Sequence, residues 1–183
     1  DVYKRQIKDQ VNKGHQVYVV YPLIEESQKL DLKDLQDGYE SLERYFPKPQ
    51  YQLGIVHGRM HPKDKDFEMK RFASNESQIL VATTVIEVGV NVPNATVMVI
   101  ENAERFGLSQ LHQLRGRIGR GSAKSYCILL TSNEISEVAQ RRMQIMTASQ
   151  DGFRIAQEDL LIRGPGDIAG TKQSGLLDFK AID

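Results

Sequence analysis

Short apolar runs without polar alternation constrain the fold of this chain more than any other feature. Four of them, VYVVY, ILVA, VMVI and CILL, occupy residues 17–21, 79–82, 97–100 and 127–130, and a weaker run, LGIV, occupies residues 53–56. A strand with one face in water alternates apolar and polar residues, whereas a strand covered on both faces can be apolar throughout. The runs therefore predict buried strands in a sheet that is covered on both faces.

Segments with helical character separate most of these runs. Residues 33–46 precede a proline, and residues 62–73 open with proline, which is favoured at the first position of a helix. Residues 109–117 and 134–148 also have helical patterns, and the second places apolar residues on one stripe. Alternation of strands and helices predicts an α/β fold, a parallel sheet flanked by helices.

The stretch after Asp159 has a different composition. It reads LLIRGPGDIAGTKQSG, with four glycines and one proline. These residues predict an irregular loop that turns sharply and lets another backbone or a ligand approach. A flexible linker is the alternative, against which the apolar residues 160–162 argue.

Length and composition bound the class of protein. The chain has 183 residues, of which 40% are hydrophobic and 26% charged, so a globular domain with or without an appendage is expected. No apolar run approaches the length of a membrane span, and the first residues lack the apolar stretch of a signal peptide, so a cytosolic location is expected. The single cysteine, Cys127, excludes an intramolecular disulfide and a cysteine-based zinc cage, and within an apolar run it is predicted to be a buried structural thiol.

The stretch QLHQLRGRIGRG, residues 110–121, is the strongest functional signal. If it is helical, Gln113, Arg117 and Arg120 share one face, and Arg115 points elsewhere. Two guanidinium groups this close can hold one phosphate group, for which their planar donors are well suited. A solvated basic turn is the alternative, because arginine-rich stretches are common on protein surfaces.

Two further segments offer groups that bind phosphates, and both follow predicted strands. Thr83 and Thr84 supply hydroxyl and backbone N–H donors, although they could instead cap a short helix. In the segment HGRMH, His57 and Arg59 could contact a backbone phosphate. Its two histidines have a zinc-like spacing, but the glycine between them and the proline after them disfavour a helix, so no metal site is predicted.

Some motifs are missing from the sequence. There is no G-x-x-x-x-G-K-[ST] loop, and no apolar strand is followed by the acidic tetrad that accompanies such a loop in nucleotide hydrolases. These residues therefore cannot hold a nucleoside triphosphate and Mg²⁺ in the usual P-loop manner. An arginine finger, in contrast, acts on a nucleotide that another domain holds.

Together these segments resemble the second RecA-like motor domain of superfamily-two helicases, and among them the RecG family of ATP-dependent DNA helicases. The segments ATTVIEVGVNVPNA and HQLRGRIGR resemble helicase motifs V and VI. The tail DGFRIAQEDLLIRGPGDIAGTKQSG resembles the translocation module that the RecG and Mfd families share, while PLIEES and VIENAERFGLSQLHQLRGR favour RecG. The resemblance implies a RecA-like domain over residues 1–132, then a helical hairpin and a glycine-rich translocation loop over residues 133–183.

The resemblance also implies roles for individual residues. Arg117 and Arg120 would reach the phosphates of ATP bound on a partner domain, and Gln113 would link the nucleotide state to the translocation module. Gly89 and Asn91 would lie near the nucleotide, although motif V usually has aspartate at the position of Asn91. The residues expected to face the DNA backbone are Thr83, Thr84, His57 and Arg59. Those expected in the translocation module are Arg141 or Arg142, with Arg163 and Gln173.

The function implied is that of a fragment of an ATP-dependent double-stranded DNA translocase that remodels branched DNA and stalled replication forks. ATP and Mg²⁺ would be held mainly by a first RecA-like domain, and a wedge domain would split the strands at the fork. A monomeric, cytoplasmic and nucleoid-associated bacterial protein is expected, without membrane contact. Two alternatives stay open: a nucleic-acid or protein binding module with no role in ATP hydrolysis, and an Mfd-type transcription-repair translocase.

Overall fold

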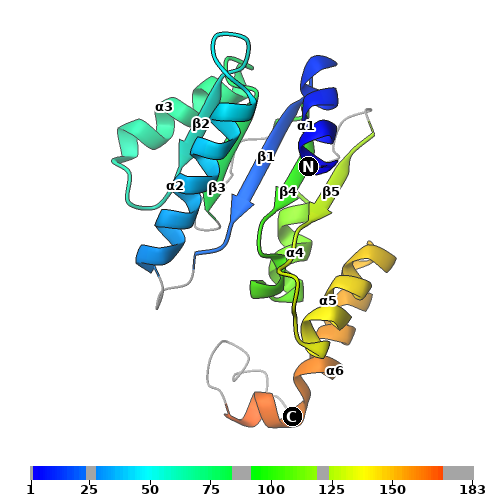
Figure 1. Cartoon of the computed structure of the whole chain (residues 1–183). Helices are drawn as coiled ribbons and strands as arrows, with labels where there is room; N and C mark the ends of the chain where they lie inside the picture. The colour runs from blue at the N-terminus through cyan, green and yellow to red at the C-terminus, as the bar shows by residue number, and fades with distance from the viewer. Residues whose placement is uncertain (1, 24–27, 84–91, 119–123, 171–183) are drawn as a thin grey trace.

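A computed structural model describes residues 2–23, 28–83, 92–118 and 124–170 of the chain, without the side chains of 28–30 and 163–170. Five parallel strands form one sheet in the order β2-β3-β1-β4-β5 (Figure 1). The strands are β1 Gln16–Tyr21, β2 Leu53–Val56, β3 Ile79–Thr83, β4 Ala95–Ile100 and β5 Tyr126–Leu129. All five apolar runs are therefore strands, as predicted, and the predicted parallel α/β sheet is confirmed.

Helices follow most strands and cover both faces of the sheet. They are α1 Val2–Asn12, α2 Gln28–Tyr45, α3 Pro62–Ala73, the short 3₁₀ helix η2 Ala103–Arg105, α4 Leu108–Arg115, α5 Glu137–Ala148 and α6 Gly152–Gly170. The predicted helices over 33–46, 62–73, 109–117 and 134–148 all exist. Helix α1 was not predicted, although Ile7, Gln10 and Val11 have helical spacing and form its buried face.

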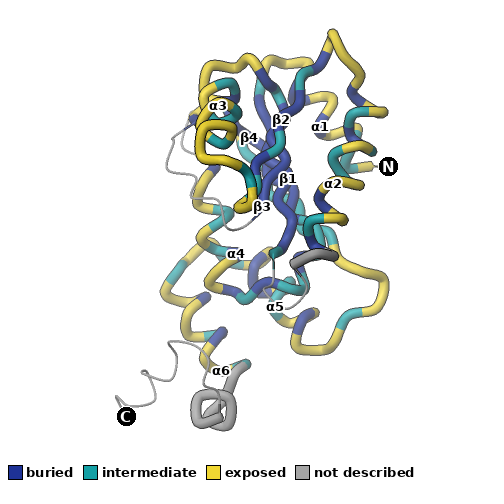
Figure 2. The backbone as a smooth tube through the Cα atoms, turned by 90° about the vertical axis from the view of Figure 1, so that its left-hand side faces the viewer, coloured by how far each residue is buried: buried dark blue, intermediate teal, exposed yellow. Residues whose placement is uncertain are grey.

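The core has two layers because successive residues of a strand point to opposite faces. In β1, which is buried along its whole length, Val17, Val19 and Tyr21 pack with α1 and α2, whereas Tyr18 and Val20 pack with α3, α4 and the last two helices. Figure 2 shows the buried strands at the centre and exposed residues along the outer sides of the helices. A strand that faces an apolar layer on each side favours apolar side chains at successive positions, which explains the continuous apolar runs.

An ion pair joins two segments that leave neighbouring strands at the carboxyl edge of the sheet. Asp31, in the first turn of α2, accepts two hydrogen bonds from Arg105 of η2, at 2.8 and 3.3 Å. The Asp31 side chain is 1% exposed and the Arg105 side chain 28%. This bidentate ion pair therefore holds the start of α2 against the segment that leads into α4.

The last two helices form a hairpin that packs on the sheet domain. Ser136 caps α5 by accepting a hydrogen bond from the Ala139 N–H at 3.1 Å, and Arg141 of α5 pairs with Glu158 of α6 at 3.2 Å. No helix in the described part of the chain is long and apolar enough to cross a membrane.

The prediction of an irregular loop after Asp159 is wrong for residues 160–170, which continue helix α6. The three glycines and the proline in this part disfavour a helix, but such propensities are weak compared with tertiary packing. Ile155 is buried in the core, and Ile162, one residue before the described side chains end, packs against the same core. The packing of Ile155 and Ile162 against the core therefore favours the helix over the predicted loop. The remainder of that loop lies outside the described residues.

The Cys127 thiol is packed in β5 against the core. Burial raises its pKa to about 11, and the nearby charge of Arg115 opposes this effect. The neutral thiol is then the dominant form at physiological pH, which agrees with the prediction of a structural cysteine.

Phe72 offers a test of the core layer that contains Tyr18. The two rings lie 4.9 Å apart, and Phe72 is fully buried on α3. We expect Phe72→Ala to lower the free energy of unfolding by about 3–5 kcal/mol, because it opens a cavity beneath the sheet. Urea unfolding followed by circular dichroism measures this loss.

Phe67→Ala is the matched control, because Phe67 lies on the same helix but is 60% exposed. Its free energy of unfolding should stay within about 0.5 kcal/mol of the parent value. Equal losses in the two variants would contradict the assignment of α3 to this core layer.

Cys127 gives a second test, through its reactivity. At pH 8 the folded chain should react with iodoacetamide on the order of 10²-fold more slowly than the urea-unfolded chain, because the raised pKa lowers the thiolate fraction. The difference between the alkylation rates of the folded and unfolded chains should become smaller as the pH approaches 11. Mass spectrometry of the alkylated chain follows both rates, and equal rates at pH 8 would show that the thiol is not shielded.

Candidate functional site

Helix α4 carries the first half of the arginine motif and ends before Arg117. Gly116 caps its C-terminus and donates its N–H to the His112 carbonyl oxygen at 3.0 Å. Arg117 lies in the turn that follows, where its N–H donates to the Leu114 carbonyl oxygen at 2.9 Å. The prediction that Gln113 and Arg117 share one helical face is therefore wrong, because the helix ends at the Gly116 cap.

Arg117 and Gln113 are both exposed. Burial raises the pKa of Tyr18 to about 12, and the charge of Arg117 opposes this rise, so Arg117 lies near the Tyr18 side of the sheet. Five predicted site residues lie outside the described residues: Arg120, Gly89, Asn91, Thr84 and Gln173. The pairing of the two finger arginines thus stays a prediction.

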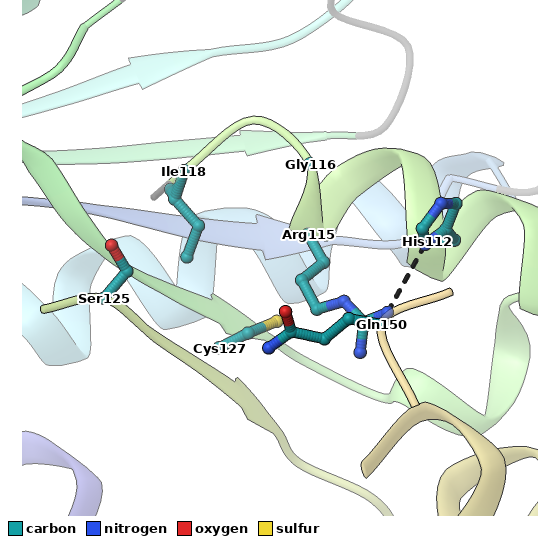
Figure 3. Close-up of a pocket in the computed structure, with 7 residues that line it drawn as sticks. All are labelled: His112, Arg115, Gly116, Ile118, Ser125, Cys127 and Gln150. Carbon is teal, nitrogen blue, oxygen red and sulfur yellow. Dashed lines mark hydrogen bonds between the residues drawn. The ribbon is translucent and has the colours of Figure 1, made fainter. Parts of the chain in front are cut away.

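The side chain of Arg115 contacts the hairpin, whereas Arg117 lies near Tyr18. Its Nη1 donates to the Met146 carbonyl oxygen in the last turn of α5. Its Nη2 lies 3.3 Å from Nδ1 of His112, one helical turn earlier (Figure 3). No role was predicted for Arg115 or His112 from the sequence, although their spacing of three residues places them on the same side of a helix.

A pocket of about 450 Å³ lies beside this contact. Residues of α4, the following turn, β5 and the connection between α5 and α6 line it (Figure 3): His112, Arg115, Gly116, Ile118, Ser125, Cys127 and Gln150. The pocket therefore lies where α4 and β5 approach the connection between the two hairpin helices.

Two of the residues predicted to face DNA, His57 and Thr83, lie at the carboxyl ends of neighbouring strands. His57 follows Val56 of β2, whose register partner in β3 is Ala82, and Thr83 follows Ala82. The structure thus brings the two predicted residues to one edge of the sheet. Open α/β sheets bind ligands at this edge.

The His57 turn is built around a neutral imidazole. The Arg59 N–H donates to His57 Nδ1 at 3.2 Å. The pKa of His57 is lowered, first by burial and then by the positive charges of Lys65 and Arg59. Because Nδ1 accepts a hydrogen bond, the proton of the neutral ring is on Nε2, which remains a donor.

Thr83 is only 2% exposed, and its hydroxyl has no hydrogen-bond partner among the described residues. A helix-capping role is not observed for it there, since it is the last residue of β3. A contact between Thr83 and a phosphate stays a prediction, and it requires this strand end to become accessible.

The predicted translocation residues lie on the hairpin. Arg141 is exposed and engaged with Glu158, and Arg142 is half-buried on the same helix. Arg163 belongs to α6. Among the residues that the structure describes, no group of three or more metal-ligating side chains is present.

Two family models match the chain in sequence. The helicase conserved C-terminal domain matches residues 2–122, and the C-terminal part of domain 3 of ATP-dependent DNA helicase RecG matches residues 149–183. The first match spans the sheet domain through α4, and the second spans α6 and the tail.

Individual RecG proteins match nearly the whole chain. ATP-dependent DNA helicase RecG of Synechocystis is 55% identical over 174 residues, which cover 94% of this chain and 21% of that protein. The RecG proteins of Bacillus subtilis and Escherichia coli are each 51% identical, over 97% and 94% of this chain and 26% and 25% of their own lengths. The chain thus spans about a quarter of the length of these relatives.

Solved structures agree with the sequence matches. The structure of RecG bound to a three-way DNA junction superposes with a TM-score of 0.73 and 43% identity, covering 97% of this chain and 23% of that one. The C-terminal domain of the DEAD-box protein Dbp5 shares only the fold, with a TM-score of 0.51, 16% identity and 76% of each chain covered. The chain therefore belongs to the family of helicase conserved C-terminal domains, and its similarity to RecG helicases runs through both the sheet domain and the tail.

Proposed function

We propose that these residues form the second motor domain and the translocation module of an ATP-dependent double-stranded DNA translocase of the RecG type. One observation carries the proposal. About half of the residues are identical to those of RecG proteins, and the match covers 94–97% of the chain, including the hairpin. Residues 1–132 would be the motor domain and residues 133–183 the module. The whole protein would remodel branched DNA and stalled replication forks.

The nucleotide would be bound between this domain and a first RecA-like domain that carries the P-loop. Arg117 is exposed and lies in the turn after α4, a position that fits a role in reaching phosphates. Arg117 and Arg120 would stabilise charge on the transferred phosphoryl group, and Gln113, Gly89 and Asn91 would lie near the nucleotide. ATP would supply the free energy of movement, with Mg²⁺ held by the first domain.

The DNA backbone would contact the carboxyl edge at β2 and β3. His57 offers an Nε2–H donor, and Arg59 and Lys65 add positive charge beside it. Such contacts to phosphate oxygens position a protein on DNA without reading its sequence, as a translocase requires. Thr83 and Thr84 would join these residues at the end of β3.

The hairpin would transmit force to the duplex. The Arg141–Glu158 pair braces α5 against α6, and Arg142, Arg163 and Gln173 would act with it in tracking DNA. The partners would be branched DNA and the first motor and wedge domains of the same, monomeric protein. The bacterial relatives and a DNA substrate support a cytoplasmic, nucleoid-associated location.

The arginine fingers give the direct test of this function. In the full-length protein, Arg120→Ala and Arg117→Ala should each lower DNA-stimulated ATP hydrolysis by on the order of 10³-fold, because the charge of the transferred phosphoryl group loses its stabilisation. The rate is measured by phosphate release with a three-way DNA junction in excess. Circular dichroism should show an unchanged fold.

Arg5→Ala, at an exposed arginine on α1, is the matched control and should retain the parental rate. Near-normal ATP hydrolysis by both finger variants would refute the proposed arrangement of the nucleotide.

A further inference from the structure

We infer that Arg115 is a positioning residue that sets the place of the hairpin relative to the arginine fingers, and so couples ATP hydrolysis to DNA movement. The inference rests on the proposed function. It concerns the arginine of the motif that has no assigned contact with the nucleotide.

The first observation is the contact between Arg115 and the end of α5. The last four carbonyl groups of a helix lack intrahelical partners and carry partial negative charge. In α5, the Ser149 N–H satisfies the Ile145 carbonyl at 3.1 Å, and the Arg115 guanidinium satisfies the next carbonyl, that of Met146. A cation from the motif helix therefore caps the hairpin's first helix.

The second observation is that His112 joins the same contact to the start of α6. A Cβ atom on Gly152, the first residue of α6, would lie 2.8 Å from His112 Nε2. On its other side the imidazole faces Arg115, at 3.3 Å from Nη2. Since a guanidinium only donates, Nδ1 is the acceptor in this bond. One pair of α4 side chains thus meets the end of α5 and the beginning of α6.

The third observation is the uneven packing around this contact. Leu108 and Leu111 of α4 share a core with Ile145, Met146 and Ile155 of the hairpin, so one side of the junction is closed. On the other side lies the pocket of about 450 Å³ that Arg115 and Gln150 line. Among the residues that the structure describes, the contacts on that side are the polar ones of Arg115, which therefore hold the hairpin there.

The fourth observation is the direct backbone link between Arg115 and Arg117. The Ile118 N–H donates to the Arg115 carbonyl oxygen at 3.3 Å, and the Arg117 N–H bonds back to Leu114. A shift of the Arg117 turn when it engages phosphates therefore moves the end of α4. Arg115 then passes the shift to the Met146 carbonyl and the hairpin.

The test is Arg115→Met in the full-length protein, since methionine keeps most of the apolar stem and removes the donors. Two rates are measured on one three-way DNA junction: ATP hydrolysis and strand separation. DNA-stimulated hydrolysis should stay within about twofold of the parent, and junctions separated per ATP should fall about tenfold, within the range known for coupling residues. Arg5→Met, the same change at an exposed arginine, should alter neither rate.

Gly152→Ala is the second variant, and it leaves Arg115 in place. The added methyl group should displace His112 and α6, and it should lower the same ratio of separation to hydrolysis. Thermal unfolding checks both variants, and Gly152→Ala decides the question if Arg115→Met does not fold.

The outcomes distinguish a failure of the proposed function from a failure of the role inferred for Arg115. A parent protein without DNA-stimulated ATP hydrolysis would refute the proposed function itself. An active parent with an unchanged ratio in the variants would overturn the role of Arg115. So would a parallel fall of both rates, because a residue that only stabilises the fold or acts in hydrolysis lowers them together.

Discussion

The burial of β1 between two apolar layers is the constraint on which the rest of the structure depends. Its odd-numbered residues, from Val17 to Tyr21, pack under α1 and α2, and its even-numbered residues Tyr18 and Val20 pack under the other helices. Because its neighbours β3 and β4 run parallel to it, all carboxyl ends meet at one edge. The segments that follow the strands, including the His57 turn and the end of β3, are gathered there for that reason.

Buried apolar residues of the hairpin share the core of the sheet domain. Ile145, Met146 and Ile155 belong to the same cluster as Tyr18 and the α4 leucines, so apolar packing joins the tail to the sheet domain. The core is thus continuous across the boundary proposed at residue 132. A module built in this way can respond to α4, because any movement of that helix changes the surface on which the module rests.

The strands and most helices could be predicted because their signals are local. A continuous apolar run carries its own evidence of burial on both faces, and a proline at residue 62 marks the start of α3. The C-terminus of α4 and the extent of α6 could not be predicted as well. A glycine is tolerated inside a helix or ends it according to the contacts around it, and Gly116 ends α4 while the glycines after residue 160 continue α6.

The parallel sheet, the arginine motif and the resemblance to helicases follow from the amino-acid sequence alone, because apolar runs and motif spacings are properties of neighbouring residues. The places of Arg115 and Arg117 depend on the three-dimensional structure. Arg117 lies in a turn and not on the helical face that spacing suggested, since Gly116 ends the helix. The partner of Arg115 is a backbone carbonyl 31 residues away, a group that every residue type carries, so no sequence pattern could have indicated it.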